Sequence, residues 1–158
     1  MTSLTVADTI NAISNDKSLA LFNHIALEAG NSDNLKTRLG LTRKQYYSRM
    51  SDLINVGLVI RNNGKYFLTS FGKVVYEAQM LIGKGIQNYW KLKAIDSIET
   101  FSAHNQLPIE EYNRFIDTLV DGNDIKDILL KNHNNKIAVT PNEIVYKNQG
   151  LIHSTRDR

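Results

Sequence analysis

The chain of 158 residues contains no cysteine, only two prolines and no long hydrophobic run. The lack of cysteine excludes disulfides, thiolate metal sites and redox sensing by cysteine. No apolar stretch approaches the roughly 20 residues that a helix needs to span a bilayer, and residues 1–4 do not begin a basic and then apolar leader. We therefore expect a cytoplasmic protein that does not contact a membrane.

The sequence also offers little for catalysis or metal binding. None of the four histidines has a His-x-Glu or Glu-x-x-His spacing beside it. They are His24, His104, His133 and His153. Glu110 and Glu111 are adjacent and diverge on a helix, which fits the positive end of a helix dipole better than acid–base catalysis. We expect no enzymatic activity, no catalytic residues, no metal and no cofactor.

The composition, 42% hydrophobic and 22% charged, is that of a globular protein with one ordinary core, or a small domain plus an extension. The charge is uneven along the chain. Residues 42–73 contain six Lys or Arg against one Asp, a net charge of +5, whereas residues 107–135 have a net charge of −3. A polyanion would dock on the positive segment, and the negative one should face away from it.

Residues 31–76 have the order helix, tight turn, helix, β-hairpin and start of a further helix. A short amphipathic helix ends at Gly40, and the Thr42 hydroxyl can cap the next helix. That helix begins at Arg43 and stops at Gly57. Its apolar positions recur at helical spacing and predict a buried face. They are Tyr46, Met50, Leu53 and Ile54.

A β-hairpin is predicted immediately after this helix. The Asn63-Gly64 pair favours a two-residue turn, and it lies between two short apolar runs at residues 58–60 and 66–68. A hairpin placed after two helices that are joined by a tight turn is the wing of a winged helix-turn-helix.

This order resembles the winged-helix transcriptional regulators of bacteria and archaea, among them the multiple-antibiotic-resistance and arsenical-resistance repressor families. Residues 35–40 resemble the L-x-x-x-L-G helix of these regulators, and residues 41–53 resemble their recognition helix. Residues 57–59 match the G-L-V before the wing, and residues 68–72 match the L-T-x-x-G after it. The similarity covers about a third of the chain. The whole also resembles small archaeal regulators that append a helical tail.

The second helix and the hairpin hold the candidate contacts to double-stranded DNA. A helix that enters the major groove uses its N-terminal residues on base edges, and Arg, Lys, Gln and Ser can pair with guanine, adenine or phosphate. The candidates are Thr42, Arg43, Lys44, Gln45, Tyr47, Ser48 and Arg49 on the helix, and Arg61, Asn63 and Lys65 on the hairpin. The alternative for the basic residues is a solvated face, and for Tyr47 it is packing under the wing.

Helical spacing also predicts the elements on either side. Residues 4–13 form a short helix, and residues 15–30 form the first helix of the motif. A long helix over residues 69–101 is interrupted at residues 83–85, where each internal glycine costs about 1 kcal/mol against alanine. The two glycines mark a kink, a break or a close backbone crossing. The predicted elements beyond it are a helix at 109–120, a turn at 121–124, a short helix at 125–130 and a hairpin at 136–146.

These elements give a mainly α fold with a small β-hairpin wing and four segments. They are a winged helix-turn-helix domain at residues 1–76, a long dimerisation helix at 77–104, a small C-terminal helical and hairpin extension at 105–148, and a flexible tail at 149–158. Because the long helix cannot bury both of its apolar stripes on so small a core, we expect it to pair with a second copy. Tyr89, Trp90 and Phe101 would be interface core, or would line an effector pocket.

The expected function is that of a sequence-specific, homodimeric transcriptional regulator. The alternative is a winged helix that binds protein in a transcription, replication or chromatin assembly. The two differ in what they require of Arg43, Lys44 and Arg49, whose charges a DNA reader needs and an interaction module does not. The sequence does not specify an effector.

Overall fold

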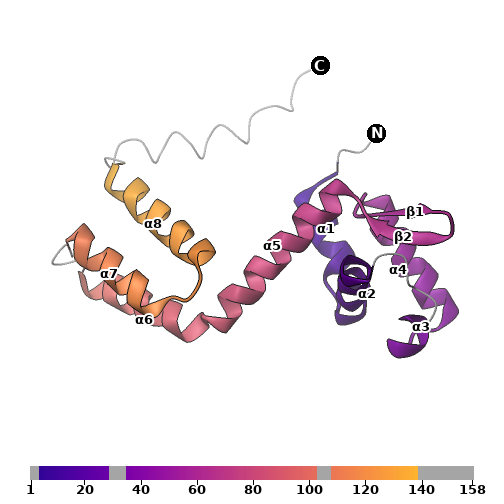
Figure 1. Cartoon of the computed structure of the whole chain (residues 1–158), viewed down its shortest axis with the longest axis horizontal. Helices are drawn as coiled ribbons and strands as arrows, with labels where there is room; N and C mark the ends of the chain where they lie inside the picture. Colours follow the sequence, from indigo (N-terminus) through magenta and orange to yellow (C-terminus); the bar gives the residue numbers. More distant parts are fainter. Residues whose placement is uncertain (1–3, 29–34, 103–107, 139–158) are drawn as a thin grey trace, which may run out of the picture. The chain divides into compact units, whose positions relative to one another are not determined.

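The computed structural model describes residues 4–28, 35–102 and 108–138 (Figure 1). Within these ranges the chain is mainly helical, with one two-stranded antiparallel hairpin, which confirms the expected fold class at this level. The elements are α1 (Val6–Ile13), α2 (Asp16–Leu27), α3 (Leu35–Arg38), α4 (Arg43–Asn55), β1 (Val59–Asn62), β2 (Lys65–Leu68), α5 (Ser70–Gln87), α6 (Tyr89–Ser102), α7 (Ile109–Leu119) and α8 (Asn123–Ala138). None of these helices is long and apolar enough to cross a membrane.

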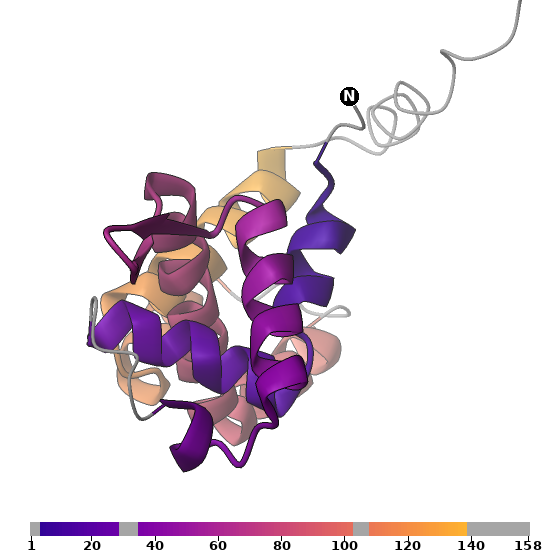
Figure 2. The same cartoon turned by 90° about the vertical axis from the view of Figure 1, so that its right-hand side faces the viewer.

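The chain divides into two compact units, and the division falls between Met80 and Leu81, inside α5. In the first unit, α4 is flanked by the hairpin and by α1, and it contacts both (Figure 2). The helix α2 contacts α1 and strand β2. The described part of the second unit contains the rest of α5 together with α6, α7 and α8.

Side-chain caps fix where the first two helices begin. The Thr5 hydroxyl accepts a hydrogen bond from the Asp8 amide, and the Asp8 carboxylate accepts one from the Thr5 amide at 3.0 Å. At the start of α2, Asn15 Oδ1 accepts from the Ser18 amide at 2.9 Å. Each cap satisfies an amide that the first helical turn leaves unpaired. Both predicted helices are confirmed.

The turn between α3 and α4 also follows the prediction. Gly40 has a φ of +59°, a left-handed conformation that costs glycine little, and it ends the short helix. Thr42 caps α4 through its hydroxyl, which accepts from the Gln45 amide at 3.2 Å. In return, Gln45 Oε1 accepts from the Thr42 amide at 3.0 Å. This reciprocal pair is a capping box.

The hairpin has the predicted two-residue turn. Asn63 and Gly64 have φ angles of +49° and +78°, so both central residues are left-handed, as a type I′ turn requires. The strands pair from Asn62 opposite Lys65 to Val59 opposite Leu68. They reach farther toward the turn than the apolar runs alone indicated.

The L-T-x-x-G segment joins the hairpin to α5 through Thr69 and Gly72. The Thr69 amide donates to the Leu58 carbonyl oxygen at 3.1 Å, and its hydroxyl donates to the Gly57 carbonyl oxygen at 2.6 Å. The same hydroxyl accepts from the Gly72 amide at 2.8 Å. Thr69 therefore holds the start of α5 against the end of α4 and the beginning of the hairpin.

One buried cluster forms the core of the first unit. It contains Leu21, Phe22, Ile25, Leu35, Leu41, Tyr46, Met50, Leu53, Leu58, Val59 and Tyr66. Three of the four predicted core positions on α4 are in it. The fourth, Ile54, is 38% exposed, so its prediction as a buried residue was wrong. The spacing of the apolar residues along α4 did not show where its buried face ends. The other elements of the core, α2, α3 and the hairpin, contribute most of the buried residues and decide how wide the covered face of α4 is.

A break at residues 83–85, one of the three alternatives for the two glycines, does not occur. Gly83 and Gly85 lie inside α5, and the break falls at Asn88. Asn88 is buried, and both its amide and its Nδ2 donate to the Lys84 carbonyl oxygen, at 3.1 and 3.0 Å. An asparagine side chain that competes for the backbone in this way disfavours a regular helix. Glycine lowers helix stability, but it does not dictate a break.

The second unit has its own core, formed by Ile95, Tyr112, Ile116, Val120 and Ile125. At its edge, Lys84 pairs with Asp124, Lys91 with Asp121, and Lys126 with Asp117 at 3.3 Å. The predicted helix at 109–120 is confirmed as α7, and Gly122, with a φ of +95°, precedes α8.

The helix α8 is longer than predicted and runs to Ala138. The first strand of the predicted hairpin at 136–146 is therefore wrong for residues 136–138, which are helical, and the remainder lies outside the described residues. No glycine or proline occurs between Gly122 and Pro141, so the sequence contains no stop signal where the strand was expected to begin.

Candidate functional site

The first turns of α4 present a basic and polar surface. Arg43, Lys44, Tyr47 and Ser48 are all exposed, whereas Met50, farther along the same helix, is buried. The core holds one face of α4, which leaves these side chains free. Thr42 and Gln45 are exposed as well, but their side chains are used in the capping box. The Gln45 amide group retains its donors for a partner.

Two arginines of the site lie over tyrosine rings. The guanidinium carbon of Arg43 is 5.8 Å from the ring centre of Tyr47, which is 52% exposed and does not pack under the hairpin. Arg61, which is exposed and lies opposite Tyr66 across the hairpin, is at the same distance from the Tyr66 ring. Such cation–π contacts restrict the side chain while the charge stays in solvent. Both guanidinium groups are thus positioned before any partner binds.

The hairpin adds further donors near its tip. Arg61, Asn63 and Lys65 are exposed. Among the described residues, no carboxylate pairs with Arg61 or Lys65, or with Arg43 or Lys44 on α4. Elsewhere in the first unit, Arg38 approaches Glu28 at 3.8 Å, whereas Lys17, Lys36 and Lys73 form no ion pair among the described residues. Several of the unpaired cations lie together on the first turn of α4 and on the hairpin.

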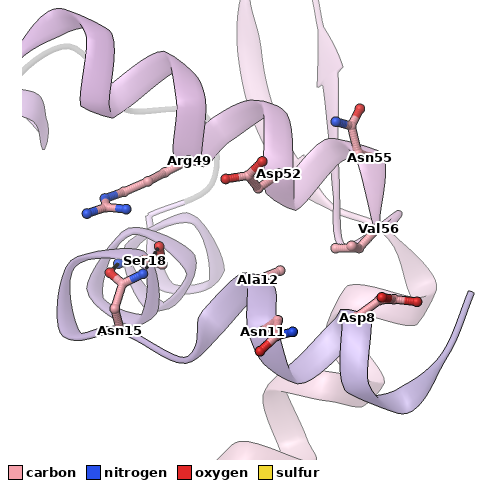
Figure 3. Close-up of a pocket in the computed structure, with 9 residues that line it drawn as sticks. All are labelled: Asp8, Asn11, Ala12, Asn15, Ser18, Arg49, Asp52, Asn55 and Val56. Carbon is pink, nitrogen blue, oxygen red and sulfur yellow. Dashed lines mark hydrogen bonds between the residues drawn. The ribbon is translucent and has the colours of Figure 1, made fainter.

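Arg49 lies apart from the other candidates. Its side chain is half-buried and lines a hollow between α1, α2 and α4, where it extends toward Asn15 and Ser18 (Figure 3). Its Nε is buried and has no hydrogen-bond partner. By helical spacing Arg49 falls at the flank of α4, beside the buried face, but no signal in the sequence indicates that α1 closes this flank into a hollow.

Two carboxylates of the protein have perturbed acidity. The Thr5 hydroxyl and amide donate to Asp8 and hold the pKa of its carboxyl below the usual value. A hydrogen bond and the charge of Lys91 likewise lower the pKa of Asp121. Both groups are fully exposed, so these shifts reflect local contacts and not burial. Asp8 lines the same hollow as Arg49 and is charged at neutral pH.

The other residues singled out from the sequence do not form a site with these. His24 lies 3.2 Å from Glu28 on the same helix. Tyr89 and Trp90 are 51% and 79% exposed, with their ring centres 5.2 Å apart. They line neither a pocket nor a core within the described unit. The side chain of Phe101 lies outside the described residues.

The chemistry available to the exposed site is recognition. Its guanidinium, ammonium, amide and hydroxyl groups can donate to phosphate oxygens and to base edges. Its only phenol, Tyr47, contacts an arginine and another tyrosine, so nothing in the arrangement activates a nucleophile. No protein-family model, no curated protein and no solved structure matches the chain.

Proposed function

We propose that this protein is a sequence-specific, DNA-binding transcriptional regulator with a winged helix-turn-helix in residues 1–76. In this proposal α4 enters the major groove, and the hairpin contacts the backbone or the minor groove. One observation carries it: unpaired, exposed cations occupy the first turn of α4 and the hairpin tip, and they have no acidic partner among the described residues. The regulator acts by occupying DNA and needs no chemistry.

The element order supports this assignment. The capped start of α4 exposes Arg43 and Lys44 in its first turn, where a recognition helix contacts base edges. Arg43 presents a planar fork that can pair with guanine, and Tyr47 holds it in place. Arg61 and Lys65 lie on strands that flank a two-residue turn, a projection that can reach phosphates.

The proposal is tested by a pair of charge-matched double variants. Arg43→Ala/Lys44→Ala removes two cations from α4, and Arg114→Ala/Lys131→Ala removes two exposed cations from the second unit. We expect the α4 variant to bind DNA at least about tenfold more weakly and to show a salt slope that is shallower by up to about 1.8, at about 0.9 per lost phosphate contact. The control should bind like the wild type.

The measurement is fluorescence anisotropy over a salt series, with a labelled duplex from the region upstream of the protein's own gene and a scrambled duplex. Preference for the native duplex supports a specific regulator. Equal affinity for both duplexes would indicate an architectural role. If neither duplex binds even at low salt, the DNA-binding proposal is wrong and a protein-interaction module is favoured.

We propose further that the regulator is a homodimer. Four large apolar side chains around the junction of α5 and α6 are more than half exposed within the described second unit: Ile82, Ile86, Tyr89 and Trp90, at 65%, 70%, 51% and 79%. A solvated cluster of this kind is unusual on a monomer and typical of an interface. A second copy would also bring a second recognition helix to the next turn of the same DNA face.

Ile86→Asp is expected to break the dimer, because each copy would bury an unpaired carboxylate in the interface. Ile128→Asp is the matched control, since Ile128 is an exposed isoleucine on α8 of the same unit. Size-exclusion chromatography with light scattering should find a dimer for the wild type and the control, and a monomer for Ile86→Asp. A monomeric wild type, or a dimeric Ile86→Asp variant, would contradict the interface.

A further inference from the structure

The hollow beside α4 has the size and lining of a small-molecule site. It measures about 310 Å³, at the lower end of the range for ligand pockets, and it lies entirely within the first unit. Its walls come from α1, α2 and α4 (Figure 3). Most of the residues around it are polar or charged, which suits water or a polar ligand.

At one end of the hollow, the Nε atom of Arg49 lacks an acceptor. It is buried and makes no hydrogen bond, and no carboxylate within the described ranges forms an ion pair with this side chain. A buried donor without an acceptor is costly, and a ligand that carries an acceptor removes that cost. A carboxylate fits best, because its two oxygens match the planar fork of arginine.

Two carboxylates, opposite in charge to Arg49, line the same hollow. Asp52 projects from α4 between Arg49 and Asp8, and Asp8 stands at the far end on α1 (Figure 3). Neither carboxylate is paired with Arg49, and the Asp52 side chain has no hydrogen bond in the described structure. Asn11 and Asn55 supply amide groups along the wall. The hollow thus separates one cation from two anions.

We propose that this hollow binds a small zwitterion, a free amino acid or a short ω-amino acid, with its carboxylate on Arg49 and its ammonium group on Asp52 or Asp8. The separation of the Arg49 guanidinium from the two carboxylates along the hollow is what selects this class over a simple anion or cation. The site does not depend on the proposed DNA binding. If α4 does read DNA, the ligand would hold Arg49 in the hollow and away from DNA.

The test is a nuclear magnetic resonance titration of the full chain without DNA. The probes, at millimolar concentration, are each standard L-amino acid together with β-alanine, 4-aminobutyrate and 6-aminohexanoate, which vary the distance between the charges. Acetate and methylammonium provide each charge alone. We expect a saturable shift of the Arg49 Nε–Hε resonance with at least one zwitterion, and affinity at least about tenfold lower for either single-charge probe.

The variants Arg49→Gln and Asp52→Asn should each weaken binding by at least about tenfold, whereas Arg114→Gln, which changes an arginine of the second unit, should bind like the wild type. No saturable shift with any zwitterion would mean that the hollow holds water only, and the proposal would be wrong. Unchanged binding in Arg49→Gln, or equal binding of acetate, would also overturn it. Since no DNA is present, none of these outcomes bears on the proposed regulator function.

Discussion

Gly72→Ala is expected to unfold the first unit at temperatures where the wild-type protein is folded. Gly72 is buried in α5, and a Cβ added there would lie 3.0 Å from the Leu58 carbonyl carbon and closer still to its oxygen. The obstacle is backbone, which cannot rotate away. Thr69 bonds both to the Leu58 carbonyl oxygen and to the Gly72 amide, so a shift of either segment would break the junction between hairpin and helix.

Overpacking against fixed backbone costs about 3 kcal/mol, which corresponds to a fall in the melting temperature of more than about 10 °C for a unit of this size. Thermal unfolding followed by circular dichroism measures it. Gly83→Ala on the same helix is the control, because a Cβ there meets no atom within 4 Å. This change should raise stability by about 0.5–1 kcal/mol. Equal melting temperatures for Gly72→Ala and the wild type would show that α5 packs differently on Leu58.

The boundaries of the helices and strands between residues 35 and 72 could be predicted from the sequence, because each boundary depends on a local signal. These signals are a left-handed Gly40, a Thr42 cap and an Asn63-Gly64 turn. Such signals act within a few residues and can be predicted without the tertiary structure. The L-T-x-x-G match was predicted only as a resemblance, and the structure supplies its physical reason in the Thr69 and Gly72 contacts.

The elements that were predicted wrongly depend on contacts that the sequence does not display. The break at Asn88 coincides with burial of this asparagine and with a hydrogen bond from its Nδ2 to the Lys84 carbonyl oxygen, which also accepts the ordinary helical bond from the Asn88 amide. Two short apolar runs at residues 137–139 and 144–146 indicated a hairpin, but α8 continues to Ala138, and no glycine or proline between Gly122 and that point ends it. Periodicity cannot distinguish a short strand from the end of a helix in so few residues.

The candidate site also contains residues whose surroundings could be predicted from the sequence and one residue whose surroundings could not. The exposure of Lys44 could be predicted, because the spacing of Tyr46 and Met50 assigns the opposite face of α4 to the core. Arg43 lies on the same side of the helix as Tyr46 and Met50, and it reaches solvent from the first turn. The environment of Arg49 could not be predicted, since it depends on how α1 packs against α4. Nothing near Arg49 in the sequence identifies Asp8 as a neighbour in the hollow.

Met50→Asp is expected to abolish folding of the first unit. Met50 is 1% exposed and belongs to the core cluster together with Phe22 and Leu53. A carboxylate there would have neither solvent nor a partner, and an unpaired buried charge costs several kcal/mol, comparable to the total stability of a small unit. The variant should show no cooperative unfolding transition of the first unit, and its DNA binding, if the proposed function is right, should disappear with the fold.

Two variants make this result specific. Ser51→Asp adds the same charge one residue later, at an exposed position, and should melt like the wild type. Met50→Leu keeps the volume and apolar character and should cost less than about 1.5 kcal/mol. If Met50→Asp melted normally while Ser51→Asp unfolded, the buried face of α4 would be the opposite one. Because that face decides which side chains of α4 reach solvent, the same result would also remove Lys44 from the exposed site.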